Sequence, residues 1–324
     1  MILETTTVGS FPKPEYLTKS RFQFSKQQIS REELLRLEQQ ATKEWVEFQE
    51  EIGIDILVDG EMYRGDMVTY FAENFKGFEI SGLVRSYGNR YYRKPVAVAE
   101  IERLNPVTVE WYQFTQALTK KPVKGMLTGP YTIMDWSFDE FYPSRRDFCL
   151  RLAEVIREEA RDLEAAGAQF IQIDEPAVSV RPEELDLAIE AMGIVTNGLK
   201  AKTLTHICYG NFEKIYPKML EIPVDQIDLE LSNAEYDLLD LFKRHPFTRE
   251  IGLGVVDVHS HRLESKEEVK KRIRKAASLI PLKQIYVSPD CGLKTRSVEE
   301  AKAKLRVMME ATLEVREEFG SEGA

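Results

Sequence analysis

The stretch that decides the fold is RRDFCLRLAEVIREEARDLEAAGAQFIQIDEP, residues 145–176. Its first part, Arg145–Ala166, is predicted to be a helix, because apolar residues recur along it at the spacing that places them on one stripe. Ala166-Gly167-Ala168 ends this helix, and the apolar run Phe170–Asp174 reads as a short buried strand with acidic residues directly after it. A helix followed by a buried strand indicates one unit of a parallel α/β sheet.

The number of such strands decides the architecture. Together with Phe170–Asp174 the sequence has eight candidate strands, the others being Thr5–Ser10, Ile54–Glu61, Val123–Thr128, Thr203–Cys208, Gln226–Leu231, Ile251–Val258 and Gln284–Ser288. Further helical patterns lie at Arg31–Ile52, Glu213–Leu220, Tyr236–Phe242, Lys266–Ile280 and Val298–Glu318, the last two with Ser265 and Ser297 as N-caps. Strands with following helices in this number predict an α/β fold, a single (β/α)8 TIM barrel, for which about 250 residues are typical. We expect residues 1–324 to form one catalytic barrel domain.

Residues 62–122 account for the extra length. This segment is rich in Tyr, Gly and Arg, and we interpret it as a long insertion, or flap, after the second strand. The alternation in Tyr91–Ile101 predicts a hairpin over the barrel mouth, and a surface flap without a functional role is an equally open interpretation. Residues 13–30 are expected to form another polar loop, after the first strand.

Composition limits the classes of partner. The chain has 324 residues, 43% of them hydrophobic, and 44 Lys and Arg against 54 Asp and Glu, for a net charge of −10. This charge repels a phosphate backbone and an anionic membrane surface, so we expect neither nucleic acid nor a membrane as partner. No apolar run has the length of a membrane span, and Met1–Ser10 lacks the features of a signal peptide, so a cytoplasmic location is the expectation.

Unusual polar residues stand at or just after the ends of the predicted strands. They are Ser10, Glu61, Asp174, Glu175, His206, Cys208, Glu230, His259 and Cys291. In a (β/α)8 barrel the carboxyl ends of the strands carry the active site, whereas the opposite face is mostly structural. The convergence of these residues on one face is stronger evidence for a site than any single motif.

Part of this set predicts a zinc site. His206 and Cys208 are two residues apart at a strand end, so their side chains point the same way, although a lone His-x-Cys is as often an accident of core packing. Cys291, after the eighth strand, and Glu230, at the end of the sixth, complete a set of two thiolates, an imidazole and a carboxylate. Sulfur ligands disfavour Mg²⁺ and Ca²⁺, and four such donors suit tetrahedral Zn²⁺.

The donor set also indicates a reaction. Two thiolates and a carboxylate around Zn²⁺ leave a formal charge of −1, so a bound substrate thiol would lose its proton and stay electron-rich. Hydrolytic zinc sites have more neutral ligands and acidify water instead. Alkylation of a thiolate is therefore favoured over hydrolysis.

The remaining polar residues suit an amino-acid substrate. Glu61 and Asp174 offer acceptors for an ammonium group and Ser10 offers donors for a carboxylate, although Asp174-Glu175-Pro176 is also explained as a helix cap and Glu61 as a surface partner of Arg64. His259 is a candidate for acid–base work or proton relay, with Asp257 as its orienting residue. Cys149 lies on a helix stripe and is expected in the core, and His245 and His261 are expected at the surface.

Five motifs are distributed over essentially the whole chain: Thr6–Pro12, Lys124–Pro130, Ile171–Ala177, His206–Tyr209 and Pro289–Arg296. Together they resemble the C-terminal catalytic half of cobalamin-independent methionine synthase. The resemblance implies a zinc-dependent (β/α)8 methyltransferase with His206, Cys208, Glu230 and Cys291 as zinc ligands. It further implies that Val8-Gly9-Ser10, Glu61 and Asp174 bind L-homocysteine and that His259 handles a proton while the thiolate takes a methyl group to give L-methionine.

The methyl donor is the point at which the sequence departs from the family. The full-length family has a second, N-terminal barrel that helps to bind methyltetrahydropteroyl-polyglutamate, and here the chain begins at the catalytic half. Trp136 matches the tryptophan on which the pterin stacks and Arg90 is kept in an altered segment, whereas Val180 stands near the place of an acidic pterin contact. Cob(I)alamin also leaves from a methyl group without a proton, whereas N5 of methylfolate needs one. We therefore expect methylcobalamin or a methylated corrinoid protein as donor, similar to short core-type methionine synthases, with methyltetrahydrofolate as the alternative.

Two other functions stay open. One is a related zinc methyltransferase for another thiol such as coenzyme M, which Glu61 and Asp174 disfavour because a sulfonate needs no acceptors for an ammonium group. The other is a non-enzymatic binder that keeps zinc to capture a corrinoid or a thiol, which His259 disfavours.

Overall fold

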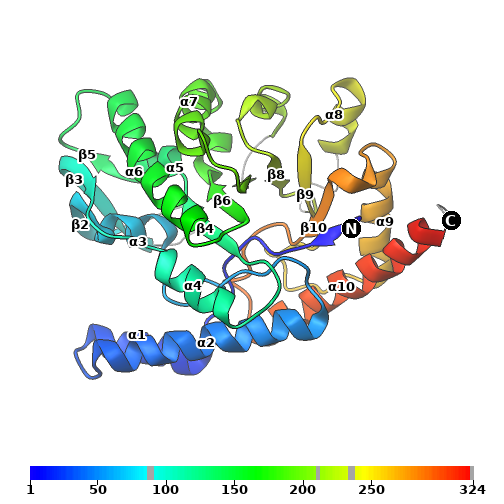
Figure 1. Ribbon diagram of the computed structural model, residues 1–324, viewed down its shortest axis with the longest axis horizontal. Helices are drawn as coiled ribbons and strands as arrows, with labels where there is room; N and C mark the ends of the chain where they lie inside the picture. Colours follow the sequence, from blue (N-terminus) through cyan, green and yellow to red (C-terminus); the bar gives the residue numbers. More distant parts are fainter. Residues whose placement is uncertain (86–90, 209–211, 233–237, 322–324) are drawn as a thin grey trace. The chain divides into compact units, whose positions relative to one another are not determined.

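The protein is described by a computed structural model, which covers residues 1–85, 91–208, 212–232 and 238–321 (Figure 1). The chain divides into two compact units. Unit 1 consists of Met1–Tyr63, Phe114–Lys124 and Asp228–Ala324, and unit 2 consists of Arg64–Gln113 and Gly125–Ile227. The expected single barrel domain over residues 1–324 stays a prediction.

Unit 1 contains parallel strands and the longest helices. Its elements are β1 (Glu4–Thr5), α1 (Glu15–Ser25), α2 (Arg31–Ile52), α8 (Leu238–Arg244), β9 (Glu250–Gly254), α9 (Lys266–Ala277), the 3₁₀ turn η6 (Leu282–Gln284), β10 (Ile285–Ser288) and α10 (Val298–Ser321). β8 (Gln226–Leu229) and α4 (Val109–Ala117) each have residues in both units. The strand order is β1-β10-β9-β8, with Glu4 opposite Tyr286 and Ile285 opposite Ile251 in parallel register.

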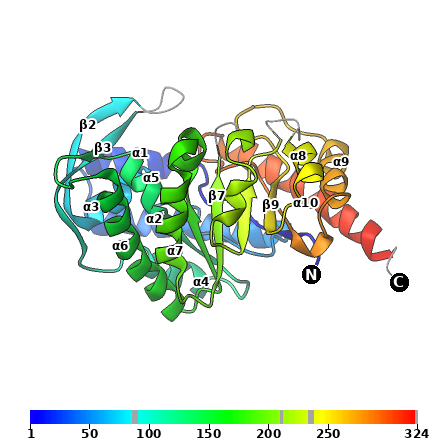
Figure 2. The same ribbon diagram turned by 90° about the horizontal axis from the view of Figure 1, so that it is seen from above.

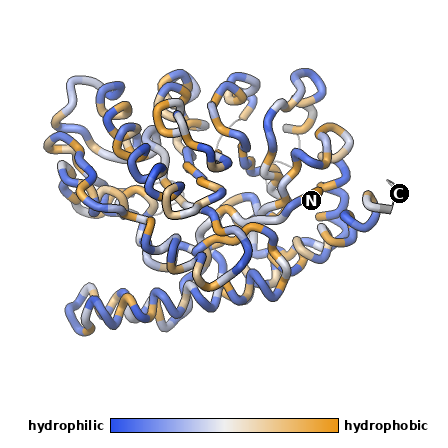
Figure 3. The backbone as a smooth tube through the Cα atoms, in the orientation of Figure 1, coloured by the Kyte–Doolittle hydropathy of each residue, from blue (hydrophilic) through white to orange (hydrophobic). Residues whose placement is uncertain are grey.

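The helices of unit 1 begin where the sequence supplies caps. The Ser30 hydroxyl accepts a hydrogen bond from Glu33 N–H at the start of α2, and Gly53 ends this helix with a φ of 88°. Ser265 forms a capping box with Glu268 at the start of α9, and the Ser297 hydroxyl accepts from Glu300 N–H before α10, so both predicted caps are confirmed. Hydrophilic and hydrophobic residues alternate along α2, as an amphipathic helix requires (Figure 3).

Unit 2 contains the remaining elements. They are α3 (Met67–Asn74), β2 (Phe75–Arg85), β3 (Tyr91–Arg103), β4 (Lys124–Thr128), whose first residue belongs to unit 1, α5 (Pro130–Asp135), β5 (Phe138–Asp139), α6 (Arg145–Ala165), β6 (Phe170–Asp174), η2 (Pro176–Val180), η3 (Pro182–Glu184), α7 (Leu185–Thr196), β7 (Lys202–Ile207), η4 (Phe212–Lys214) and η5 (Lys218–Glu221). The main strand order is β7-β6-β4, with Phe170 opposite Lys202 in parallel register. A second sheet, of order β2-β3-β5, carries the antiparallel β2–β3 pair (Figure 2).

Several predicted elements are confirmed, and others differ. α2 and β6 have the predicted bounds, and Tyr91–Ile101 forms the predicted hairpin strand as part of β3. Of the expected strand Ile54–Glu61, the structure retains a single parallel bridge from Leu57 to Val123. The interpretation of 62–122 as an insertion stays a prediction.

Two segments were assigned the wrong structure. Residues 13–30, expected as a loop, contain helix α1, which buries little more than Leu17 and Ser20 and so shows a weak apolar stripe. Glu213–Leu220, expected as a helix, forms the 3₁₀ turns η4 and η5, because Pro217 in its middle has no N–H and clashes with the preceding turn of an α-helix.

No helix among the described residues is both long enough and apolar enough to span a membrane. The cytoplasmic location stays a prediction.

Candidate metal and substrate site

In unit 2 the predicted metal ligands His206 and Cys208 lie together. His206 is in β7 and Cys208 follows directly after it, and both side chains are buried. A ring nitrogen of His206 and Sγ of Cys208 lie within 4.8 Å of each other, as expected for alternate residues on one side of an extended chain. An imidazole and a thiol in this arrangement form one half of the predicted zinc set.

Asp174 and Glu175 end β6 and connect it to its neighbours within unit 2. The Asp174 carboxylate accepts a hydrogen bond from Gln172 Nε2 at 2.8 Å, and its carbonyl accepts from Gly129 N–H at 2.8 Å. The N–H of Glu175 donates to the carbonyl of His206 at 3.1 Å. The residue that follows Asp174 is therefore joined to the predicted zinc ligand His206 by a main-chain hydrogen bond.

The Glu175 side chain is held at the start of α5. Its carboxylate accepts hydrogen bonds from Tyr131 N–H at 3.0 Å and from the N–H and hydroxyl of Thr132, both at 2.7 Å. Burial raises the pKa of Glu175 to about 7, against the lowering effect of these donors. A Cβ at Gly129 would lie 2.1 Å from the carboxyl carbon of Glu175, so only glycine fits there. Glu175 thus fixes the loop between β4 and α5, a role beyond the helix cap considered from the sequence.

In unit 1 the other predicted ligands, Glu230 and Cys291, lie near His259. Nε2 of His259 is 2.8 Å from a carboxylate oxygen of Glu230, which is itself buried just after β8. This hydrogen bond is the largest cause of a raised His259 pKa, and the negative charges of Glu230, Cys291 and Asp257 add to it. The protonated imidazole is therefore favoured beside the acidic ligands. Asp257 accepts at Oδ1 from the His259 backbone N–H, at 2.7 Å, and in this way orients the main chain of His259.

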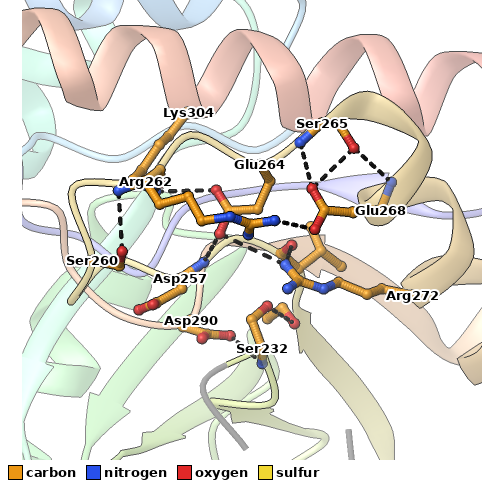
Figure 4. Close-up of polar contacts among 12 residues, drawn as sticks. Ser232, Asp257, Ser260, Arg262, Glu264, Ser265, Glu268, Arg272, Asp290 and Lys304 are labelled. Carbon is orange, nitrogen blue, oxygen red and sulfur yellow. Dashed lines mark hydrogen bonds and ion pairs between the residues drawn. The ribbon is translucent and has the colours of Figure 1, made fainter. Parts of the chain in front are cut away.

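The residue before Cys291 supports the backbone that follows Glu230. Asp290 is fully buried, and its Oδ1 accepts hydrogen bonds from Leu231 N–H at 3.1 Å and Ser232 N–H at 2.9 Å (Figure 4). A Cβ at Gly254 would lie 2.3 Å from the same oxygen, so the end of β9 has no room for a side chain and requires glycine at this position. Asp290 therefore positions the chain around two predicted ligands without contacting a substrate.

A buried ion pair holds the loop that carries His259. The Glu264 carboxylate accepts from Asp257 N–H at 2.8 Å and pairs with Lys304 Nζ at 3.0 Å, and Lys304 also donates to the carbonyl of Arg262 (Figure 4). The side chains of Glu264 and Lys304 are 2% and 1% exposed, so the two charges compensate each other in a dry environment. Arg272 contributes a longer contact to Glu264, of 3.7 Å.

The predicted substrate segment Val8-Gly9-Ser10 lies against the loop after β10. Val8 and Gly9 are buried and Ser10 is half-buried. The N–H of Leu293 donates to the Ser10 carbonyl at 2.7 Å, and a Cβ at Gly292 would lie 2.1 Å from Ser10 Oγ. The loop that carries Cys291 and the predicted substrate segment therefore meet within unit 1.

Glu61 has an unusual backbone. Its φ is +57°, in the left-handed region that costs free energy for a residue with a side chain. Its N–H donates to Oδ1 of Asp59 at 2.9 Å, and its carbonyl accepts from Lys13 Nζ at 3.2 Å. A strained, half-buried glutamate held in this way supports the expectation that its side chain has a binding role.

Trp136, a predicted donor residue, and Val180, which stands near the place of an acidic pterin contact in the family, lie in unit 2. Trp136 caps the C-terminal end of α5, and its carbonyl accepts a hydrogen bond from the Tyr92 hydroxyl at 2.9 Å. Val180, at the end of η2, is exposed. Arg90 lies outside the described residues.

Other residues are placed as expected, and some were missed. Cys149 is buried in α6, where burial raises its pKa well above the usual value, and His245 and His261 are exposed. The missed residues are Lys13, Glu264, Asp290 and Lys304. Asp290 could have been found from the sequence, because it is a charged residue directly before the predicted ligand Cys291. Glu264 and Lys304 gave no such signal, since they lie on ordinary polar or amphipathic stretches.

Comparison with known proteins identifies the family. The family described as "Cobalamin-independent synthase, Catalytic domain" matches residues 3–314. A 5-methyltetrahydropteroyltriglutamate–homocysteine methyltransferase of Campylobacter jejuni is 43% identical over 98% of this chain and 44% of the relative. The chain thus spans less than half the length of that relative. A methionine synthase of Saccharolobus solfataricus is 40% identical over 99% of this chain and 97% of the relative.

A solved structure shows the same architecture. A B12-independent methionine synthase from Shewanella sp. W3-18-1, in complex with selenomethionine, matches with a TM-score of 0.89 and 30% identity over 99% of this chain and 100% of that one. The α/β fold of the TIM-barrel type, expected from the strand count, is confirmed by this match.

The expected methyl donor is wrong. The matched family is cobalamin-independent, and the Campylobacter relative is named for 5-methyltetrahydropteroyltriglutamate, so methylcobalamin or a corrinoid protein is not the supported donor. The error has a physical origin. The leaving-group argument ranks donors by the ease of the reaction, whereas the donor that an enzyme uses also depends on which one its site binds.

These matches cover nearly the whole chain, and one relative has nearly the same length. The chain therefore belongs to the family of cobalamin-independent methionine synthases, a family of methyltransferase enzymes, and corresponds to their catalytic domain.

Proposed function

We propose that this chain transfers the methyl group of a 5-methyltetrahydropteroyl-glutamate to the sulfur of L-homocysteine and releases L-methionine. The observation that carries the proposal is the match, over 99% of the chain and 97% of the relative, to a methionine synthase. The name of the Campylobacter relative supplies the donor and the thiol.

We further propose that His206, Cys208, Glu230 and Cys291 bind one zinc ion. The proximity of His206 to Cys208 supports this, as does the grouping of Glu230 and Cys291 around His259. Two thiolates, an imidazole and a carboxylate form a zinc-type donor set. Zinc held there would lower the pKa of the homocysteine thiol so that a nucleophilic sulfur exists at neutral pH.

The remaining residues have roles around this centre. Glu61 and Asp174 accept the ammonium group of homocysteine, and the Val8-Gly9-Ser10 segment binds its carboxylate. In the transfer the sulfur–carbon bond forms as the bond from the methyl carbon to N5 breaks, and N5 then leaves with a proton. His259, whose pKa is raised beside Glu230, is a proton carrier close to this centre. Trp136 offers an aromatic face to the pterin.

The first experiment measures methionine formation. Zinc-loaded protein receives homocysteine with methyltetrahydrofolate as monoglutamate or as triglutamate, and methylcobalamin serves as a separate arm. We expect methionine from the folate donors. Turnover with methylcobalamin alone would contradict the proposed donor.

A matched set of cysteine variants tests the zinc site. Cys208→Ser and Cys291→Ser should lose bound zinc and activity together, whereas Cys149→Ala, which changes a core cysteine outside the site, should keep both. Zinc content is measured by elemental analysis of the purified protein. Full activity in metal-free protein would contradict the zinc proposal.

A further inference from the structure

A group of cations in unit 1 borders the predicted substrate segment. Lys13 follows Ser10 in the loop before α1, and its half-buried ammonium donates to the Glu61 carbonyl at 3.2 Å. Lys294 follows Cys291 in the loop that contacts Ser10 through Leu293 N–H, and its side chain is exposed. Lys13 therefore lies against the Glu61 backbone and Lys294 lies on the loop that contacts Ser10, in a protein with a net charge of −10.

Two carboxylates act on Lys13 through their charge, those of Glu61 and Glu38, and Glu38 is already paired with arginines. Glu38, fully buried in α2, has Arg21 at 2.6 Å on one oxygen and Arg31 at 3.2 Å on the other. Within the part of the chain that the structure describes, the hydrogen-bond partner of Lys13 Nζ is an uncharged carbonyl, and no carboxylate lies at ion-pair distance from it. Among the described residues, the half-buried ammonium of Lys13 therefore has no carboxylate in direct contact, and Glu61 and Glu38 act on it from beyond ion-pair distance.

The electrostatics of Lys13 agree with this geometry. The pKa of Lys13 is lowered to about 8, chiefly by burial and next by the positive charges of Arg21 and Lys294, against the raising effects of Glu61 and Glu38. An anion brought to this place would relieve the repulsion among the three cations. Such a charge would be bound partly out of water, where its attraction to an ammonium is stronger than at the open surface.

We propose that Lys13 and Lys294 form a carboxylate-binding subsite beside Glu61. The identity of its ligand rests on the proposed function, in which two reactants bring carboxylates: the glutamate tail of the pterin donor and the α-carboxylate of homocysteine. Both sources share the chemistry that a lysine ammonium binds, a compact anion with exposed oxygens.

Equilibrium binding tests the subsite without requiring turnover. γ-Linked triglutamate, homocysteine, and methyltetrahydrofolate as mono- and triglutamate are titrated separately into the zinc-loaded protein and into Lys13→Met and Lys294→Met. Lys283→Met is the control, because Lys283 is exposed and precedes β10 whereas Lys294 follows it. Lys13→Arg keeps the charge and should retain binding, and thermal melting shows whether each variant is folded.

The result expected is a weakening of about tenfold in Lys13→Met for a carboxylate ligand, as for a lost hydrogen bond to a charged group. Weaker binding of triglutamate species with unchanged monoglutamate and homocysteine assigns the subsite to the donor tail, and weaker binding of homocysteine assigns it to the α-carboxylate. Unchanged affinity for every ligand in folded Lys13→Met and Lys294→Met would overturn the subsite. Because binding is measured directly, this result is distinct from a failure to form methionine.

Discussion

Lys304, on the helix α10, places its ammonium 3.0 Å from the carboxylate of Glu264, on the loop that follows His259. Neither side chain has appreciable contact with water, and the same carboxylate receives the N–H of Asp257. Removing one member of such a pair destabilises the folded protein, because the other member is then a buried charge without compensation.

Replacing Lys304 with methionine should therefore destabilise the protein strongly. We expect Lys304→Met to lower the free energy of unfolding by about 3–5 kcal/mol, measured by urea titration. The double variant Lys304→Met, Glu264→Gln should recover part of this loss, because the amide is neutral and still accepts from Asp257. Arg262→Ala, which breaks the exposed pair with Glu268, is the control and should change stability little. If the free energy of unfolding falls no more in Lys304→Met than in Arg262→Ala, the Glu264–Lys304 pair does not stabilise the fold.

Glycine at position 129 should not be replaceable. In Gly129→Ala the new Cβ would overlap the Glu175 carboxyl group, which is held by Tyr131 and Thr132 and cannot move away without losing these hydrogen bonds. We expect a loss of about 1–3 kcal/mol in the free energy of unfolding and a weaker affinity for homocysteine, since Asp174 is adjacent. Gly198→Ala is a control in open space, although its φ of +85° carries its own strain. Wild-type stability in Gly129→Ala would refute the overlap.

Removal of the His259 imidazole should separate metal binding from turnover. His259→Ala should keep bound zinc, because His259 is not in the proposed ligand set, and should lower kcat by roughly 10²-fold, the lower end for loss of a positioned acid–base group. Zinc content and kcat are measured on the same preparation. If kcat stays at the wild-type value, His259 has no part in proton transfer.

The affinity for carboxylate ligands should depend on pH through Lys13. Lys13 has a pKa of about 8, so its ammonium is fully charged well below pH 8 and is lost as the pH rises through this value. The charged groups that act on Lys13 are Arg21 and Glu38 from the helices α1 and α2, Glu61, and Lys294. We expect triglutamate affinity to fall between pH 7 and 9 in the wild type, and the fall to be smaller in Lys13→Met. Parallel curves for the two proteins would contradict this assignment.

Much of the fold could be predicted because its strands are short, buried and bounded by polar residues. β6 has the predicted bounds, and its acidic end carries Asp174 and Glu175 as expected. Ile54–Glu61 could not be told from a strand by its apolar run, since the run is buried whether or not it forms a ladder, and only Leu57 pairs. Helix α1 was missed because a helix that buries few residues shows no strong apolar period.

In the candidate site, the ligands could be predicted from the sequence and the residues that support them could not. Residue chemistry predicted His206, Cys208, Glu230 and Cys291 as one ligand set, because thiols, imidazole and carboxylates at strand ends are uncommon by chance. The supporting residues were not visible, since Lys304 and Glu264 are distant in sequence from His259 and acquire their roles only through packing. Glu61 was proposed from its carboxylate, whereas its φ of +57° could not be predicted, because it is a property of the folded backbone alone.

The support of the His259 loop by α10 has a consequence for synthesis. A chain emerges from the ribosome with its N-terminus first, so Asp257, His259 and Glu264 are made well before Lys304. Until α10 has emerged and docked, Glu264 lacks the buried ammonium of Lys304 as its partner, and the loop that carries His259 lacks this support. Helix α10, which is translated after this loop, thus completes the support of the loop, and a chain released before Lys304 would contain every predicted zinc ligand and still lack the Glu264–Lys304 pair.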